Sequence, residues 1–313
     1  MRIIFLGSPA VAVIPLEALV QAGYQIVAVV TQPDRPAGRR NTLTPPPVKL
    51  AAERLGLPVL QPQSLRDPAA VAQLAALQPD LGVVAAYGEI LRDNVLAVPP
   101  LGYLNIHPSL LPRHRGPAPV AGAILAGDTE TGVSVMRLER GMDSGPILAQ
   151  QSVPLPPDAR AGAFTTAMFE LGSQIMLDVL PAYAHGTLTP QPQDHSRATL
   201  TAMIRKHDGQ VDWRMPAVQI ERMVRAYDPW PSTFGFWKGQ QLKLLDVRVR
   251  SDLPATHPIG TLWSEAGQPL VTTGTDVLEL RQVQPAGKRP MAGAVWLNGQ
   301  RSAIGQQFDA PQE

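Results

Sequence analysis

The sequence contains no cysteine, and this absence removes several kinds of chemistry at once. It excludes a disulfide framework, a thiol nucleophile and a zinc ion held by thiolates, and it suits a reducing compartment. Six histidines are present, but no His-Glu-x-x-His pair or comparable ligand spacing accompanies them. We therefore expect no metal site, and we expect a cytoplasmic protein.

Long apolar runs and an excess of charge of one sign are also missing. No stretch approaches the ~20 apolar residues of a membrane-spanning helix. The residues from Met1 to Gly7 are too few for a signal-peptide core and are better interpreted as a first strand. The formal net charge is +1, so nucleic-acid binding would have to come from local patches. With 313 residues, 44% hydrophobic and 17% charged, the chain is long enough for two globular domains.

Near-continuous apolar runs alternate with amphipathic stretches in the first half of the chain. This alternation predicts a mostly parallel sheet that is covered by helices on both faces. We expect strands over 2–6, 25–30, 57–60, 81–86, 101–106, 133–138 and 147–153, and helices over 11–22, 48–55, 68–77 and 162–180. The first turn, from Gly7 to Pro9, lacks the Gly-x-Gly-x-x-Gly fingerprint of a dinucleotide site. It could receive an anion or be a plain strand-to-helix turn.

The pattern changes after a polar, proline-rich stretch. A helix is expected over 216–226, followed by short strands over 234–237, 241–249, 260–263, 269–273 and 277–283. Short strands at this spacing predict a small β-barrel. We therefore divide the chain into an N-terminal domain of residues 1–188, a linker of residues 189–206 and a C-terminal domain of residues 207–313.

The most informative stretch runs from Asn105 to Pro112 and reads Asn-Ile-His-Pro-Ser-Leu-Leu-Pro. Side chains alternate along a strand, so Asn105 and His107 leave the end of the fifth strand on the same side. A carboxylate follows downstream in Asp143-Ser144-Gly145. An amide, an imidazole and a carboxylate together suit acyl transfer, because they can stabilise an oxyanion and move a proton near neutral pH.

Each of these residues also has an ordinary interpretation as a turn or packing residue, and Asp143 can cap the turn in which it lies. Ser109 is a weak candidate nucleophile, since no Gly-x-Ser-x-Gly elbow surrounds it.

The two segments together resemble the formyltetrahydrofolate-dependent formyltransferases, whose site combines an Asn-x-His-x-Ser-Leu-Leu-Pro segment with a later Asp-Ser/Thr-Gly segment. The similarity continues through 207–213, 228–231 and 284–288, so it covers essentially the whole chain. It implies an α/β fold with a doubly wound, mostly parallel, Rossmann-like sheet, followed by a small C-terminal β-barrel of the oligonucleotide-binding type.

The resemblance also implies 10-formyltetrahydrofolate as the formyl donor. Asn105 and protonated His107 would donate to the oxyanion, while Asp143 would hold His107 in the required state and take up the amine proton through water. The same resemblance implies that the folate is contacted by Ser109, Leu110, Leu111, Pro112, Tyr87, Gly88 and Ile90.

The connection from Pro33 to Lys49 is unusually long for a strand-to-helix loop and carries four basic residues against one acidic residue. A solvated, mobile loop is the ordinary interpretation. The part from Gln32 to Arg39 resembles the insertion that family members acting on initiator methionyl-tRNA place in the acceptor stem. From Arg197 to Arg250, ten Lys and Arg residues stand against five Asp and Glu residues, an excess that can follow phosphates. The implied tRNA contacts are Arg35, Arg39, Arg40, Lys206, Lys243, Arg248 and Lys288.

These features predict formyl transfer to the amine of methionyl initiator tRNA by a monomer without a protein partner. Three alternatives stay open. The first is transfer to a small amine such as a sugar nucleotide, against which the basic loop argues. The second is hydrolysis of formyltetrahydrofolate, which has no evident need for a C-terminal barrel. The third is a non-catalytic RNA-binding module, which the intact Asn105, His107 and Asp143 disfavour.

Overall fold

In the computed structural model, which describes residues 1–37, 42–300, 302 and 304–310, the apolar runs of the first half form one seven-stranded sheet. The strand order is β5-β2-β1-β6-β7-β8-β9. The first five are parallel to their neighbours, and β8 and β9 complete the sheet in antiparallel pairing. The strands are β1 (Arg2–Gly7), β2 (Gln25–Val30), β5 (Val59–Leu60), β6 (Leu81–Ala85), β7 (Tyr103–His107), β8 (Glu130–Arg137) and β9 (Ile147–Pro154).

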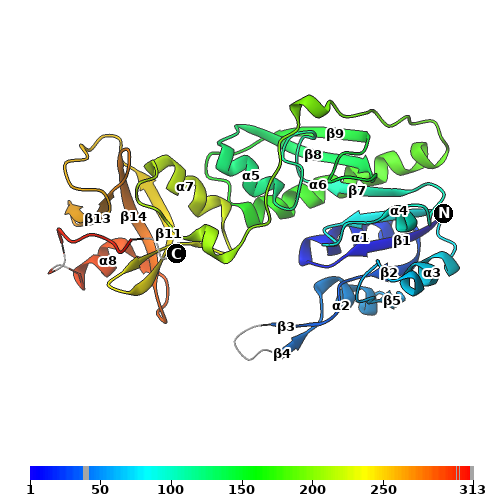
Figure 1. Cartoon of the computed structure of the whole chain (residues 1–313), viewed down its shortest axis with the longest axis horizontal. Coiled ribbons are helices and arrows are strands. Elements are labelled where there is room, and N and C mark those ends of the chain that lie inside the picture. The colour runs from blue at the N-terminus through cyan, green and yellow to red at the C-terminus, as the bar shows by residue number, and fades with distance from the viewer. Residues whose placement is uncertain (38–41, 301, 303, 311–313) are drawn as a thin grey trace. The chain divides into compact units, whose positions relative to one another are not determined.

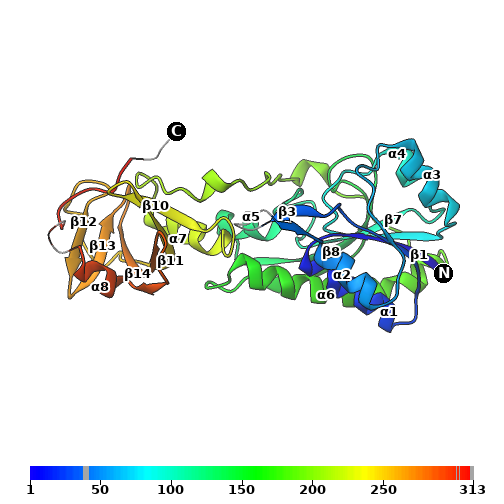
Figure 2. The ribbon, with the colours of Figure 1, turned by 90° about the horizontal axis from the view of Figure 1, so that it is seen from below.

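Helices cover both faces of this sheet, as the apolar pattern predicts. Figure 2 shows α1, α2 and α6 on one side of the sheet and α3 and α4 on the other. The helix α3 begins at a proline directly after Asp67, whose carboxylate accepts the Ala69 N–H at 2.9 Å. The helical segments are η1 (Ala10–Ala12), α1 (Val13–Gln21), α2 (Pro47–Arg54), α3 (Pro68–Ala76), α4 (Asp93–Leu96), α5 (Pro119–Ala126), α6 (Ala161–Ala184) and η2 (His195–Arg197).

The second half forms an antiparallel sheet of its own, in the order β10-β11-β14-β13-β12 with β15 paired to β14. Its core gathers Trp213, Trp237 and Phe308, with the Phe308 ring 4.6 Å from that of Trp213 and 4.8 Å from that of Trp237. The elements are η3 (Lys206–Gly209), α7 (Ala217–Ala226), β10 (Thr233–Trp237), β11 (Gln240–Val249), β12 (Leu262–Glu265), β13 (Gln268–Thr272), β14 (Val277–Pro285), β15 (Met291–Ala292) and α8 (Gly293–Asn298). The predicted order, a mostly parallel α/β sheet followed by an antiparallel β domain, is confirmed (Figure 1).

By contact, the chain divides into two units. The N-terminal unit comprises residues 1–120, 129–155 and 163–202, and the C-terminal unit comprises residues 121–128, 156–162 and 203–313. Among the described residues, no helix combines the length and apolarity needed to cross a membrane.

The long connection after β2 contains a short element of regular structure. It includes a short antiparallel pair, β3 (Arg35–Ala37) and β4 (Thr42–Thr44). At its base, the Asp34 carboxylate accepts from Gln61 Nε2 at 2.7 Å and from Lys49 Nζ at 2.9 and 2.8 Å. The Gln61 hydrogen bond, followed by that of Lys49, lowers the pKa of Asp34. These contacts connect the residue before β3 to α2 and to the segment after β5.

Gly172 lets α6 lie directly on the sheet. A Cβ built at this position would be 2.4 Å from Ile106 Cγ2 and 2.9 Å from Val133 Cγ1, which belong to β7 and β8. Both distances are far below van der Waals contact, so an added methyl group would push the helix away from the strand that carries His107.

We expect Gly172→Ala to lower the free energy of unfolding by about 1–3 kcal/mol, the usual cost of overpacking a core. A Gly-to-Ala change inside a helix ordinarily stabilises by roughly 0.5–1 kcal/mol, so a decrease in the free energy of unfolding would indicate the close approach of α6 to the sheet. Chemical denaturation measures it, with Ala167→Gly at an exposed position of α6 as the measure of helical propensity alone. Unchanged or increased stability of Gly172→Ala would contradict the close approach.

Candidate active site

The candidate site lies at the carboxyl ends of the parallel strands. The chain runs from β1 outward to β2 and β5 and then returns to β6 on the other side of β1, which makes this edge the switch point where open α/β sheets bind ligands. Ser8 connects the strand ends there. Its Oγ donates to the Tyr87 carbonyl at 3.3 Å and accepts the Gln32 N–H at 3.1 Å. The first turn is therefore built into the framework of this edge.

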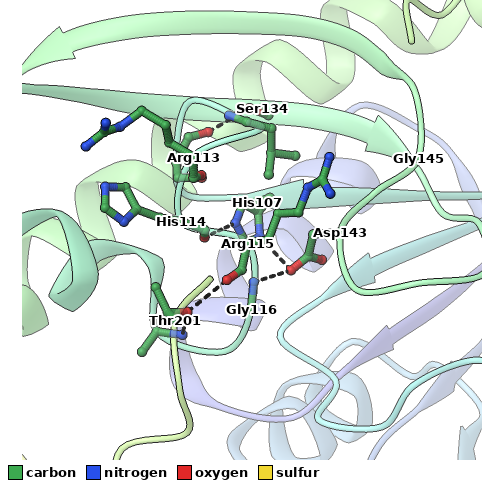
Figure 3. Close-up of polar contacts among 12 residues, drawn as sticks. His107, Arg113, His114, Arg115, Gly116, Ser134, Asp143, Gly145 and Thr201 are labelled. Carbon is green, nitrogen blue, oxygen red and sulfur yellow. Dashed lines mark hydrogen bonds and ion pairs between the residues drawn. The ribbon is translucent and has the colours of Figure 1, made fainter. Parts of the chain in front are cut away.

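His107, the last residue of β7, is only 4% exposed. Its Nε2 lies 3.0 Å from the His114 carbonyl oxygen, which can only accept, so Nε2 carries the proton (Figure 3). Nδ1 is then the ring atom that can change protonation, and it lies 3.6 Å from Asp143 Oδ2. Burial lowers the pKa of His107, against the opposing effects of the Asp143 charge and the His114 hydrogen bond, and the Arg115 charge lowers it further. At rest, Nδ1 is an acceptor.

Asp143 lies in the connection between β8 and β9 with φ of 47°, a left-handed conformation. Its Oδ2 accepts the Gly116 N–H at 2.7 Å. Gly116 has φ of 110°, and a Cβ there would lie 2.7 Å from the Thr201 carbonyl oxygen, so only glycine fits. Oδ1 of Asp143 accepts no hydrogen bond from the part of the chain that the structure describes. One oxygen is thus fixed by the protein, and the other can receive a proton.

Asn105 precedes His107 by two residues on β7 and shares its face of the sheet. It is 8% exposed and lies in register between Val84 of β6 and Met136 of β8. Its side-chain amide has no hydrogen-bond partner within the described ranges. The amide is therefore available to donate a hydrogen bond to a substrate oxygen.

The loop after His107 is held by polar groups from the antiparallel strands. Ser134 Oγ of β8 donates to the Ser109 carbonyl at 2.6 Å and accepts the Leu111 N–H at 3.1 Å. Gln150 Nε2 of β9 donates to the Leu111 carbonyl at 2.9 Å. The Ser109 hydroxyl donates to the Arg113 carbonyl at 2.7 Å. Ser109 is thus fully engaged in shaping the loop and is not presented as a nucleophile.

The residues predicted to contact folate fall into two groups. Ser109 and Leu111 are buried, as is Tyr87, whose hydroxyl has no hydrogen-bond partner among the described residues and whose pKa is raised by burial. Ile90 is 67% exposed. The structure therefore brings both segments, 87–90 and 109–112, to the strand ends beside His107. Leu110, Pro112 and Ile90 have accessible side-chain surface. Gly88, which has φ of 91°, is also exposed and presents its backbone.

The residues predicted to contact tRNA are spread over several elements. Arg35 is exposed on β3 and donates to Gln32 Oε1 at 3.0 Å. Arg39 and Arg40 lie outside the described residues. In the C-terminal unit, Lys206, Arg248 and Lys288 are exposed, while Lys243 is partly buried, with Nζ 3.4 Å from Ser232 Oγ.

A bulge in β11 brings Lys243 and Arg248 to one face. Five positions apart on a regular strand, they would lie on opposite faces. The register against β14 shifts around Asp246, so Leu244 and Val247 both face the core and the two basic residues both face away from it.

Several residues of this site carry no recognisable signal in the sequence. Ser134, Gln150 and Gln193 are ordinary polar residues in apolar or mixed runs, and only their contacts reveal their part in the site. The run from Arg113 to Gly116 follows the recognised motif directly, and its two arginines, histidine and glycine were the available clue. No group of three potential metal ligands occurs among the described residues.

Comparison with known families agrees with this geometry. A profile described as "Formyl transferase" matches residues 1–180, and one described as "Formyl transferase, C-terminal domain" matches residues 203–301. The chain belongs to the formyl transferase family.

Curated relatives resemble the chain over nearly its whole length. A methionyl-tRNA formyltransferase of Chloroflexus aggregans is 64% identical over 96% of this chain and 97% of its own. One of Roseiflexus sp. is 61% identical over 98% and 95%. One of Desulfotalea psychrophila is still 42% identical over 96% and 93%.

Solved structures share the fold at low identity. HypX from Aquifex aeolicus in complex with tetrahydrofolic acid has a TM-score of 0.63 and 18% identity, covering 97% of this chain and 48% of that one. An N-formyltransferase from Helicobacter canadensis, complexed with folinic acid and dTDP-3-aminofucose, has a TM-score of 0.66 and 14% identity over 91% and 99%.

The buried imidazole allows a direct test. We expect NMR titration to place the pKa of His107 below its ordinary value of 6.5 and Asp143→Asn to lower it further, since the substitution removes a charge that raises it. Asp178→Asn, an exposed position of α6, controls for the loss of one negative charge. A pKa above 6.5, or one indifferent to Asp143→Asn, would contradict the described geometry.

Proposed function

We propose that this chain transfers the formyl group of 10-formyltetrahydrofolate to the free amine of methionyl initiator tRNA. The observation that carries the chemistry is the approach of His107 Nδ1 to within 3.6 Å of Asp143 Oδ2 at the end of β7, with Asn105 two residues earlier on the same face of that strand. The observation that selects the substrate is full-length identity of up to 64% with relatives named methionyl-tRNA formyltransferase.

In the first half of the reaction, the neutral amine attacks the formyl carbon and the carbonyl π pair moves to the oxygen. The Asn105 amide donates to that oxygen, because it has no competing partner among the described residues. The amine proton passes to Oδ1 of Asp143 or to Nδ1 of His107, both of which are acceptors at rest. Once Nδ1 is protonated, His107 is a cation beside Asp143 and a second donor to the oxyanion.

In the second half, the oxyanion collapses and the bond from the formyl carbon to the folate nitrogen breaks. The proton held by the His107–Asp143 pair returns to that nitrogen, so tetrahydrofolate and formylated methionyl-tRNA leave and the site is restored. The His114 carbonyl keeps Nε2 protonated throughout, which confines the exchange to Nδ1. No side chain forms a covalent intermediate, in agreement with the engaged hydroxyl of Ser109.

The folate lies, in this proposal, along 109–112 and 87–90, where apolar side chains and exposed backbone adjoin the strand ends. The tRNA contacts come from the β3–β4 hairpin with Arg39 and Arg40, and from Lys206, Lys243, Arg248 and Lys288. We propose the cytoplasm as the location, since a cysteine-free chain suits the reducing compartment in which charged tRNA is used.

A transfer assay separates the candidate reactions. Formyl-labelled 10-formyltetrahydrofolate is incubated with methionyl initiator tRNA, or with a dTDP-amino sugar, and the label is followed. Label in tRNA is expected. Label only in the sugar, or only in free formate, would replace the proposed function with the small-amine or the hydrolytic reaction.

Asn105→Ala, His107→Ala and Asp143→Ala should each lower turnover by on the order of 10²-fold or more, because each removes a donor or a proton acceptor from the reacting atoms. Double substitutions should cost much less than the sum of the single ones. Circular dichroism and folate binding confirm the folded state. Near-normal turnover of folded His107→Ala would remove the imidazole from the mechanism.

The hairpin makes a separable contribution. Arg39→Ala combined with Arg40→Ala should weaken productive tRNA engagement by ~1–3 kcal/mol if a base contact is lost. If only a phosphate contact is lost, the salt slope should fall by about one unit. Folate affinity should not change, and exposed Arg66→Ala provides the matched control. Wild-type kinetics of the double variant on initiator tRNA would exclude the hairpin from recognition.

A further inference from the structure

Residues 191–201, within the stretch that the sequence suggests is a linker, are built into the candidate site. The backbones of Gln191 and Ile147 bond to each other at 2.7 and 2.8 Å. The Arg115 N–H donates to the Thr199 carbonyl at 2.9 Å, and the Thr201 N–H donates to the Arg115 carbonyl at 2.8 Å. After the short helical turn η2, residues 199–201 thus run beside the loop that carries Arg115 and Gly116, with Leu200 in an isolated parallel bridge to Arg115. Neither family profile covers it, since one ends at residue 180 and the other begins at residue 203.

Gln193 is the buried member of this segment, with 6% of its surface exposed. Its Nε2 donates to the Asp143 carbonyl at 2.8 Å and to the Gly145 carbonyl at 2.6 Å. Its Oε1 accepts from Arg115 Nε at 3.1 Å and from Nη2 at 2.7 Å. Both ends of the amide are therefore engaged, and one side chain joins three segments of the chain.

Arg115 completes the connection on the other side. Its side chain is 7% exposed and, among the described residues, has no carboxylate within ion-pair distance; its partners are Gln193 and Nδ1 of His195 at 3.0 Å. The next residue, Gly116, donates to the Asp143 carboxylate (Figure 3). Asp143 is consequently held twice, by its carboxylate through Gly116 and by its carbonyl through Gln193.

The two contacts stabilise an unfavourable backbone conformation of Asp143. Asp143 adopts the left-handed conformation, which costs a non-glycine residue energy and persists only when its surroundings enforce it. Gly141 and Gly145 on either side have no side chains that could lock the loop. Two hydrogen bonds from a buried amide on the carbonyls of Asp143 and Gly145 supply that lock.

We propose that Gln193 is a positioning residue for formyl transfer, which holds the Asp143 carboxylate at its working distance from Nδ1 of His107. The inference rests on the proposed function and deepens it by assigning a role to a segment outside both family profiles. Gln193 touches no reacting atom and acts entirely through Asp143. Its alternative role is to anchor Arg115 and the segment to the N-terminal unit, with no effect on the chemistry.

Two substitutions distinguish these roles. Gln193→Glu preserves the volume and the acceptor for Arg115 but replaces the two donors with an oxygen that repels the carbonyls of Asp143 and Gly145. Gln193→Ala removes both connections. A pure anchor would tolerate Gln193→Glu, whereas a positioning residue would be impaired by both. Gln191→Ala is the matched control, since its exposed side chain bonds only to the Thr189 carbonyl at 3.1 Å and its backbone pairing is retained.

We expect Gln193→Ala and Gln193→Glu to lower kcat by about 10- to 100-fold, as displacement of a reacting group by ~1 Å does, with KM for both substrates little changed. The pKa of His107, read by NMR and from the pH profile of kcat, should fall, because a displaced Asp143 raises it less. In an Asp143→Asn background, Gln193→Ala should add little. Gln191→Ala should match the wild type.

Wild-type behaviour of Gln193→Glu would overturn the proposal, as would a Gln193→Ala variant with reduced thermal stability but unchanged kcat and pKa of His107. If Gln193→Ala does not fold, the kcat and the His107 pKa of Gln193→Glu are compared with those of the wild type instead. The NMR titration needs no substrate, so it tests the positioning role even if the wild type fails to formylate tRNA. A failure of the proposed function is therefore distinguishable from a failure of this inference.

Discussion

The hydrogen bond between His107 Nε2 and the His114 carbonyl determines how the rest of the site works. A carbonyl has no proton to give, so the bond assigns the ring proton to Nε2 and leaves Nδ1 as the variable atom. Without this hydrogen bond, the neutral ring could carry its proton on either nitrogen. The Asp143 carboxylate, 3.6 Å from Nδ1, would then favour the proton on Nδ1. With it, a buried imidazole of lowered pKa faces the strand edge as an acceptor.

The antiparallel end of the sheet provides the support that this geometry needs. A purely parallel sheet would place helix connections on both sides of β7. Here β8 lies directly beside it, and register pairs Ser134 with His107. Ser134 and Gln150 of β9 can therefore bond the loop that follows His107 from the adjacent strands. On the opposite face, Gly172 allows α6 to press on Ile106, between Asn105 and His107. The strand is thus fixed from the side and from one face.

The sequence predicts the framework well, because its signals are local. Apolar runs located most strands of the N-terminal unit within one or two residues, and period-two alternation placed Asn105 and His107 on one face. The contacts that finish the site are not local. Gln193 lies 50 positions from Asp143 and 78 from Arg115, and nothing in a polar, proline-rich run indicates burial. The β3–β4 pair was missed for a related reason: its short strands have no apolar alternation, and their order depends on the Asp34 anchor.

The pairing of residues 191–201 with the site has a consequence for the order of synthesis. Asn105, His107 and Asp143 have all been made when the ribosome reaches residue 143, and a growing chain tends to fold from its N-terminus. The loop that presents Asp143 nevertheless remains unlocked until Gln193 and Thr201 have cleared the exit tunnel. A nascent chain therefore passes through a stage in which the sheet is assembled but the carboxylate is not yet in place. By then the tunnel already holds part of the run that begins at Met203, so the Asp143 loop is completed only after synthesis of the second unit is under way.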